Sequence, residues 1–206
     1  MIKYAVFDWD GTIADTYPIL YAAYCKAARE IGLEQPSYEY IKQITGSLQN
    51  KDVMNYLFGQ KAHEASTFFY RYIKQHHVQG LKMISGALEL LNFCKQNNIQ
   101  PFLLTNKRQC YLNEELKHFK LENRFTNIVS AGLYQEDKPH PIACKALFQG
   151  NIPPNNEIVV IGDGQSDIKV AEVLGAKSII LGEHIKGDYN IQHLLQAIDI
   201  IKGKLL

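Results

Sequence analysis

Acidic side chains follow two apolar segments of this 206-residue chain. Asp8 and Asp10 come directly after residues 2–7, and Asp163 and Asp167 follow residues 158–161. Carboxylates that lie a few ångströms apart cannot all stay ionised unless a cation sits among them. Oxygen ligands of this kind suit Mg²⁺, although Asp167 alone could instead interact with the dipole of a following helix. The four carboxylates therefore predict a magnesium site.

Two further motifs accompany the acids. Thr105 and Asn106 follow the apolar residues 101–104, and Lys138 precedes a helical pattern that begins at Pro141. In an open parallel sheet the functional site forms at the carboxyl ends of the strands. We therefore expect four carboxylates, a hydroxyl and a lysine to converge at one edge of a sheet.

Strand-like and helix-like segments alternate through most of the chain. Alternation of this kind predicts βαβ units, and hence an α/β fold with a Rossmann-like parallel sheet and helices on both faces. The expected strands cover residues 2–7, 101–104, 127–129, 158–161 and 178–181. The expected helices cover residues 87–97, 109–119, 141–149, 166–174 and 191–202.

Residues 16–82 interrupt this alternation with helical patterns alone. The patterns lie near residues 17–31, 38–44, 52–58 and 62–77, with Gly46 and Asn50 in a loop between two of them. We therefore expect an inserted all-helical domain at 16–82 and an α/β core made of residues 1–15 and 83–206.

The composition is that of a globular protein and excludes several classes. Hydrophobic residues make up 46% and charged residues 21%, with a net charge of +1 and no basic run suited to nucleic acid. Apolar runs stay far below the ~18 residues of a membrane span. The first residues do not resemble a signal peptide, and the four cysteines form no C-x-x-C pair. We expect a cytoplasmic protein that binds neither nucleic acid nor membrane.

The ordered set D-x-D-G-T, T-N, K-P and G-D-x-x-x-D resembles the haloacid dehalogenase superfamily over nearly the whole chain. The resemblance implies a phosphatase in which Asp8 attacks phosphorus and becomes an aspartyl-phosphate. It implies that Asp10 is the general acid and then the base. Thr105, with the amide of Asn106, would bind the phosphoryl group, and Lys138 would neutralise its oxygens.

The same resemblance implies a Mg²⁺ cofactor. Its ligands would be the carboxylates of Asp8 and Asp163, the main-chain carbonyl of Asp10, and Asp167 directly or through water. Gly11 would let the chain turn toward the insert, and Thr12 would form a hydrogen bond within that turn.

The insert lies between the first and second motifs, as in superfamily members with a small helical cap. Thr105-Asn106-Lys107 and the run 138–141 look most like the phosphoglycolate phosphatase branch, which acts on a small phosphorylated metabolite. Trp9, where Phe or Leu is more usual, and Gly164, where Ser or Thr often stands, depart from that branch. Thr45, Gly46 and Arg108 are further candidates for substrate contact.

Several alternatives remain open on the residues alone. An intact Asp10 argues against a dehalogenase or a phosphonatase, which lack the second acid. A sugar phosphomutase of the same superfamily stays possible, as does a noncatalytic regulatory module that binds a phosphoryl group. Nucleoside monophosphates and sugar phosphates are alternative substrates to phosphoglycolate, and no residue pattern distinguishes a monomer from a homodimer.

Overall fold

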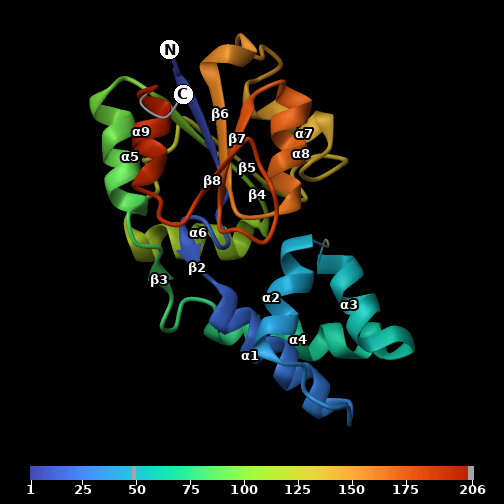
Figure 1. The fold of residues 1–206 in the computed structure, drawn as a ribbon. Coiled ribbons are helices and arrows are strands. Elements are labelled where there is room, and N and C mark those ends of the chain that lie inside the picture. Colours follow the sequence, from blue (N-terminus) through green and yellow to red (C-terminus); the bar gives the residue numbers. More distant parts are fainter. Residues whose placement is uncertain (48–49, 204–206) are drawn as a thin grey trace. The chain divides into compact units, whose positions relative to one another are not determined.

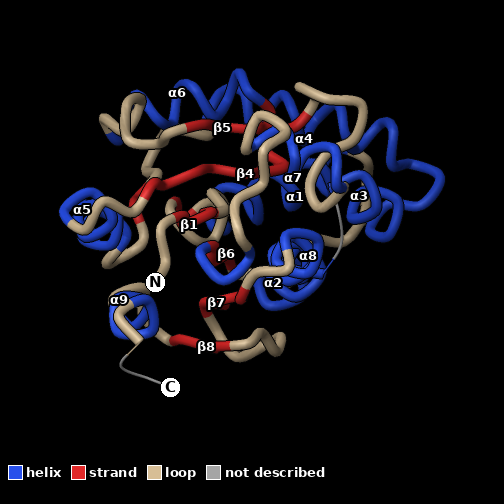
Figure 2. The backbone as a smooth tube through the Cα atoms, turned by 90° about the horizontal axis from the view of Figure 1, so that it is seen from above, coloured by secondary structure: helices blue, strands red, loops and turns tan. Residues whose placement is uncertain are grey.

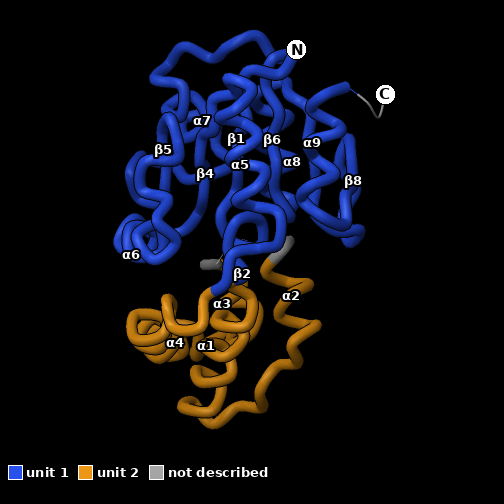
Figure 3. The backbone as a smooth tube through the Cα atoms, turned by 90° about the vertical axis from the view of Figure 1, so that its left-hand side faces the viewer, with its two compact units in different colours: residues 1–15, 82–206 blue, residues 16–81 orange. Residues whose placement is uncertain are grey.

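The computed structural model describes residues 1–47 and 50–203 and divides the chain into two compact units. One unit comprises Met1–Asp15 and Lys82–Leu206, and the other comprises Thr16–Leu81 (Figure 3). The chain therefore leaves the first unit once and returns to it once.

The first unit is built on a six-stranded sheet with the strand order β5-β4-β1-β6-β7-β8 (Figure 2). Every neighbouring pair in it is parallel. The expected fold class is therefore confirmed. The strands are β1 (Tyr4–Phe7), β4 (Gln100–Arg108), β5 (Asn127–Ala131), β6 (Ile158–Gly162), β7 (Lys177–Leu181) and β8 (Tyr189–Ile191).

Helices cover both faces of this sheet because its central strands bury side chains on both sides. Figures 1 and 2 show α7 and α8 on one face, and α5 and α9 on the opposite face. Val6, Val160 and Leu104 pack with Leu147 and Val170 in the core below α7 and α8. The helices of this unit are α5 (Ala87–Gln96), α6 (Gln109–Phe119), α7 (Pro141–Leu147), α8 (Gln165–Leu174), α9 (Gln196–Ile201) and the 3₁₀ turn η2 (Asn155–Glu157).

A short antiparallel pair lies where the chain leaves and re-enters this unit. Strand β2 (Ala14–Asp15) pairs with β3 (Lys82–Met83), and the amide of Ile84 donates to the carbonyl of Ile13 at 2.9 Å. The two ends of the inserted segment are thereby tied together.

The second unit contains helices and one 3₁₀ turn among its described residues. Helix α1 packs on α4, with the Tyr24 and Phe69 rings 4.6 Å apart. Pro18 lies in the first turn of α1, where its missing N–H costs no hydrogen bond. The elements are α1 (Tyr17–Glu30), α2 (Tyr38–Ser47), α3 (Asn50–Phe58), η1 (Gly59–Lys61) and α4 (Ala62–His76).

Three details differ from the sequence-based expectations. Gly46 and Asn50 were both expected in a loop, but α2 continues through Gly46 and α3 begins at Asn50; residues 48–49 of that expected loop lie outside the described residues. Strand β4 continues past Leu104, because the pairing with β5 resumes at Arg108 after an irregularity. Ile191 belongs to β8, paired with Leu181, and the last helix starts only at Gln196.

Across residues 1–47 and 50–203, none of the helices has the length and apolar character that crossing a membrane requires.

Candidate active site

The end of β1 starts the site. The amide of Asp8 donates to the carbonyl of Ile161 at 2.9 Å, so the residue is held directly beside β6. The chain then turns at Gly11, whose φ of 76° favours glycine and whose amide donates to the carbonyl of Ala14 at 2.9 Å. The segment that follows β1 is thus fixed by backbone hydrogen bonds on both sides of Trp9.

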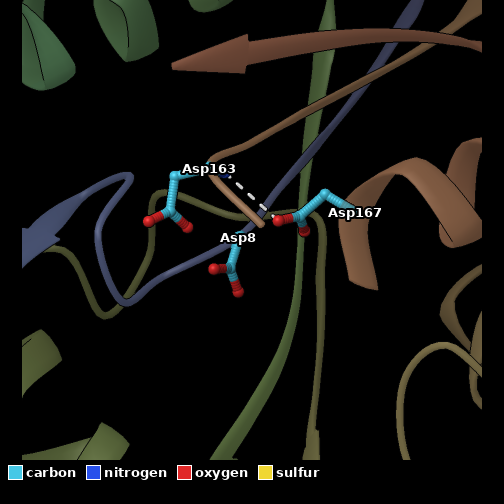
Figure 4. A group of neighbouring side chains, drawn as sticks. All are labelled: Asp8, Asp163 and Asp167. Atoms are coloured by element: carbon cyan, nitrogen blue, oxygen red, sulfur yellow. Dashed lines mark hydrogen bonds between the residues drawn. The ribbon is translucent and has the colours of Figure 1, made fainter. Parts of the chain in front are cut away.

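Three carboxylates gather at the carboxyl ends of β1 and β6. Figure 4 shows Asp8, Asp163 and Asp167 close together, and one oxygen from each lies within 4.8 Å of the others. Their residues are 9%, 8% and 1% exposed. Within the part of the chain that the structure describes, this is a group of acidic side chains able to hold a metal ion.

Backbone amides hold Asp167 in place. Its Oδ2 accepts hydrogen bonds from the amides of Asp163 at 3.2 Å and Gly164 at 2.9 Å. A Cβ at Gly162 would lie 2.5 Å from the Asp167 Cβ, and closer still to the carboxylate. Only glycine at position 162 lets the first turn of α8 place Asp167 against the end of β6.

One lysine reaches into the acidic group. The Lys138 Nζ lies 2.7 Å from Asp8 Oδ1 and 2.5 Å from Asp167 Oδ1, and it donates to the carbonyl of Leu104 at 3.2 Å. Burial lowers the pKa of the Lys138 ammonium, but Asp167 and Asp8 outweigh burial and raise it. Lys138 therefore stays protonated, and three carboxylates with one ammonium carry a formal charge of −2.

That excess charge also affects Asp8. Burial, together with Asp167 and Asp10, raises the pKa of the Asp8 carboxyl to about 7, although Lys138 opposes the change. A divalent cation would compensate the charge of −2, and the donor set consists of carboxylate oxygens, which Mg²⁺ prefers. The residues present therefore fit a Mg²⁺ ion.

Thr105 and Asn106 lie near the end of β4. Thr105 is 2% exposed, and its Oγ1 accepts a hydrogen bond from the amide of Lys107 at 3.1 Å. The Asn106 Nδ2 donates to the carbonyl of Lys138 at 3.0 Å, which links this strand end to the loop that carries the lysine. The Asn106 side chain thus positions Lys138 through its backbone.

Asp10 lies outside the group of three carboxylates, although its charge contributes to the raised pKa of Asp8. Its Oδ1 lies 2.5 Å from the Nζ of Lys107, which also lies 3.1 Å from Oε2 of Glu115. The Trp9 indole donates to the same Glu115 oxygen at 2.6 Å. The backbone bends at Trp9, so Asp8 and Asp10 face different partners.

The sequence analysis missed Lys107 and Glu115 as functional candidates. A signal existed, because Glu115 occupies a buried position in the apolar stripe of α6, between Leu112 and Phe119. A charged residue in such a stripe is rarely buried without a partner.

Other predicted site residues lie as follows. The amide of Thr12 donates to the carbonyl of Trp9 at 3.3 Å, but its buried Oγ1 has no hydrogen-bond partner among the described residues. The expected hydrogen bond within the turn is therefore made by the backbone only. Thr45 is a helical residue whose Oγ1 donates to the carbonyl of Ile41 at 2.7 Å. Arg108 is exposed at the last position of β4.

Residues 5–181 match the family described as haloacid dehalogenase-like hydrolase. The chain belongs to this family. The match covers both the segment with Asp8 and the segment with Asp167, so the acidic group of this hydrolase lies within the region that defines the family. The family resemblance expected from the sequence motifs is confirmed.

Named relatives of this hydrolase share about a quarter of its residues. A protein from Caldanaerobacter subterraneus subsp. tengcongensis with the provisional name pyrophosphatase PpaX is 25% identical over 98% of this chain and 96% of its own. The phosphoglycolate phosphatase of Pseudomonas fluorescens is 24% identical over 87% of this chain and 69% of its own. A crystal structure described as a predicted phosphoglycolate phosphatase from Haemophilus somnus 129PT has a TM-score of 0.83 at 20% identity, covering 97% of each chain. This structural likeness confirms the fold.

Proposed function

We propose that this hydrolase is a Mg²⁺-dependent phosphatase that cleaves a small-molecule phosphate monoester through an aspartyl-phosphate on Asp8. The observation that carries the proposal is the buried group of three carboxylates around Lys138, with its formal charge of −2. Such a group suits a divalent cation and a substrate that is bound through its phosphate. The family and the names of the relatives support the same reaction class.

We propose that Asp8, Asp163, Asp167 and the main-chain carbonyl of Asp10 hold the ion, directly or through water. When bound, Mg²⁺ supplies a Lewis acid that offsets the negative charge of the phosphoryl oxygens and of Asp8. The remaining chemistry falls to side chains of the chain.

In the first step the Asp8 carboxylate attacks phosphorus, so an O–P bond forms to Asp8 and the bond from phosphorus to the leaving oxygen breaks. Asp10 donates a proton to the departing oxygen, which leaves as an alcohol. Lys138 keeps Asp8 oriented and stabilises charge that develops on the transferred group. Thr105 Oγ1 and the Asn106 amide bind phosphoryl oxygens.

In the second step a water molecule attacks the same phosphorus, and Asp10 accepts its proton. The bond between phosphorus and Asp8 then breaks, which releases inorganic phosphate and restores the Asp8 carboxylate. Both acids end each cycle in their starting state, so the proposed reaction consumes only the ester and water.

For the substrate we propose phosphoglycolate, on the motif resemblance and the relatives of that name. We further propose that the helical unit 16–81 is the cap, because the chain inserts it between the segment with Asp8 and the segment with Thr105. A cap excludes water from the reacting group. Thr45 and Gly46, the candidates for substrate contact, lie in this unit, and the Thr45 hydroxyl already donates a hydrogen bond to the carbonyl of Ile41 within α2. We also propose a cytoplasmic location.

The test is phosphate release from a panel of esters that includes phosphoglycolate, nucleoside monophosphates, sugar phosphates and pyrophosphate, with Mg²⁺ or with EDTA. We expect Mg²⁺-dependent turnover that Asp8→Asn abolishes, with the highest kcat/KM naming the substrate class. Folded protein that binds Mg²⁺ but hydrolyses no ester would refute the phosphatase. Interconversion of sugar phosphates without phosphate release would instead establish a phosphomutase.

A further inference from the structure

We propose that Lys107 and Glu115 are positioning residues that aim one oxygen of the Asp10 carboxyl at the leaving group. The inference rests on the proposed phosphatase reaction and extends it to a network of polar side chains behind Asp10, the Asp10 network. In this network Lys107 forms ion pairs with Asp10 and Glu115, and the Trp9 indole donates a hydrogen bond to Glu115.

The contacts of the Asp10 network are short, and Glu115 at its inner end is fully buried. Lys107 Nζ lies 2.5 Å from Asp10 Oδ1 and 3.1 Å from Glu115 Oε2, and the Trp9 indole N–H donates to Glu115 Oε2 at 2.6 Å. The Glu115 side chain is 0% exposed, that of Lys107 is 11% exposed, and that of Asp10 is 31% exposed. The Asp10 network thus extends from the buried Glu115 through Lys107 to the partly exposed carboxyl of Asp10.

A general acid needs one carboxyl oxygen that carries the proton and faces the substrate. Lys107 is only a hydrogen-bond donor, so it occupies Asp10 Oδ1 as an acceptor whether or not the carboxyl is protonated. The exchangeable proton is therefore confined to Oδ2. Because Lys107 also fixes the rotation of the carboxyl group, Oδ2 keeps one direction through both steps.

Glu115 balances the charge of Lys107. Without it, a nearly buried ammonium would have the partly exposed Asp10 as its main counter-ion, and the two would be free to separate toward solvent. Trp9 donates to the Glu115 oxygen that faces Lys107, which keeps that carboxylate from rotating. A Phe or Leu at position 9 could not donate this hydrogen bond.

The Asp10 network shares no ion pair with the contacts of Asp8. Lys138 contacts Asp8 and Asp167, whereas Lys107 contacts Asp10 and Glu115. The amide of Lys107 also donates to Thr105 Oγ1 at 3.1 Å, so one short segment positions both a phosphoryl ligand and the proton donor. Two lysines thereby orient the nucleophile and the acid independently.

The test compares esters whose leaving groups need protonation to different extents. An alkyl phosphate such as phosphoglycolate expels a strongly basic alkoxide and needs the acid, whereas 4-nitrophenyl phosphate expels a weak base and needs it little. The quantity compared between the two esters is kcat/KM, which reports the steps up to and including phosphoryl transfer to Asp8. For Lys107→Met we expect kcat/KM to fall about 10- to 100-fold on the alkyl ester and about 3-fold or less on the aryl ester.

Companion variants separate positioning from folding. Glu115→Gln and Trp9→Phe should shift the alkyl-to-aryl ratio of kcat/KM in the same direction by about 2- to 10-fold, because each weakens one contact behind Lys107. Lys117→Met, which removes an exposed lysine from α6, the helix of Glu115, should leave kcat/KM on both esters unchanged. If Lys107→Met does not fold, Lys107→Gln serves, and the aryl activity reports an intact site.

Two results would overturn the proposal. Equal losses on both esters would show that Lys107 supports the fold and not the proton transfer, and no loss on the alkyl ester would show that Asp10 needs no such support. A wild-type protein without activity on either ester would contradict the phosphatase itself, which distinguishes that failure from a failure of this inference.

Discussion

Asp8→Asn is expected to abolish turnover and at the same time to stabilise the metal-free protein. Asp8 is buried with two other carboxylates and one lysine, and burial raises the pKa of its carboxyl from 3.8 to about 7. Each pKa unit corresponds to about 1.36 kcal/mol, so keeping Asp8 ionised in the folded state costs about 4 kcal/mol at most. Asparagine can still accept the hydrogen bond from Lys138 but carries no charge.

The pH window follows from the direction of the shift. Between pH 4 and 7 the folded state keeps a proton on Asp8 that the unfolded state has lost. The free energy of unfolding therefore falls as the pH rises through this range, and the loss is complete above pH 7. Asp8→Asn removes this dependence, so the variant and the wild type should differ little at pH 4 and most at pH 8.

The assay is urea and thermal unfolding of both proteins in EDTA between pH 4 and pH 8. We expect Asp8→Asn to gain roughly 2–4 kcal/mol at pH 8, which corresponds to a rise in Tm of about 4–16 °C. Glu136→Gln, which removes an exposed acid of the same unit, is the control and should not reproduce the gain. An Asp8→Asn protein that is no more stable than the wild type at pH 8 would refute the reasoning.

Three further outcomes are expected. Lys138→Met leaves Asp8 and Asp167 buried without their ammonium, so the free energy of unfolding should drop by about 3–5 kcal/mol in EDTA and turnover should vanish; a stable, active variant would contradict the assigned contacts. Gly162→Ala places a Cβ 2.5 Å from that of Asp167, so calorimetry should find Mg²⁺ affinity at least about 10-fold weaker, and unchanged affinity would show that Asp167 does not support the ion. Mg²⁺ binding at pH 7 should release about half a proton from Asp8, and almost none at pH 9, as measured by calorimetry in buffers of different ionisation enthalpy. Release that does not depend on pH would point to another group.

Much of the fold could be predicted from local patterns. The apolar segments that became β1, β4, β6 and β7 are recognisable because central strands of a parallel sheet are apolar on both faces, and the edge strand β5 shows as a shorter apolar run. A helical insertion is predicted at 16–82 because that segment carries helical periodicity without strand-like runs, and the second compact unit comprises Thr16–Leu81. The sequence predicts a helix from Ile191 onward, but Ile191 is the third residue of β8. A strand of three residues is too short to show a period, and its pairing with β7 decides its conformation.

The sequence by itself determined the order of the acidic motifs and their place after the apolar segments, since chain order and periodicity are local properties. Tertiary structure alone decided which carboxylates meet. Asp8, Asp163 and Asp167 come together because β1 and β6 are neighbours, and Asp10 turns to Lys107 because the chain bends at Trp9. The contact between Trp9 and Glu115 joins residues 106 positions apart. No local pattern encodes such a contact, because it exists only once α6 packs against the segment that follows β1.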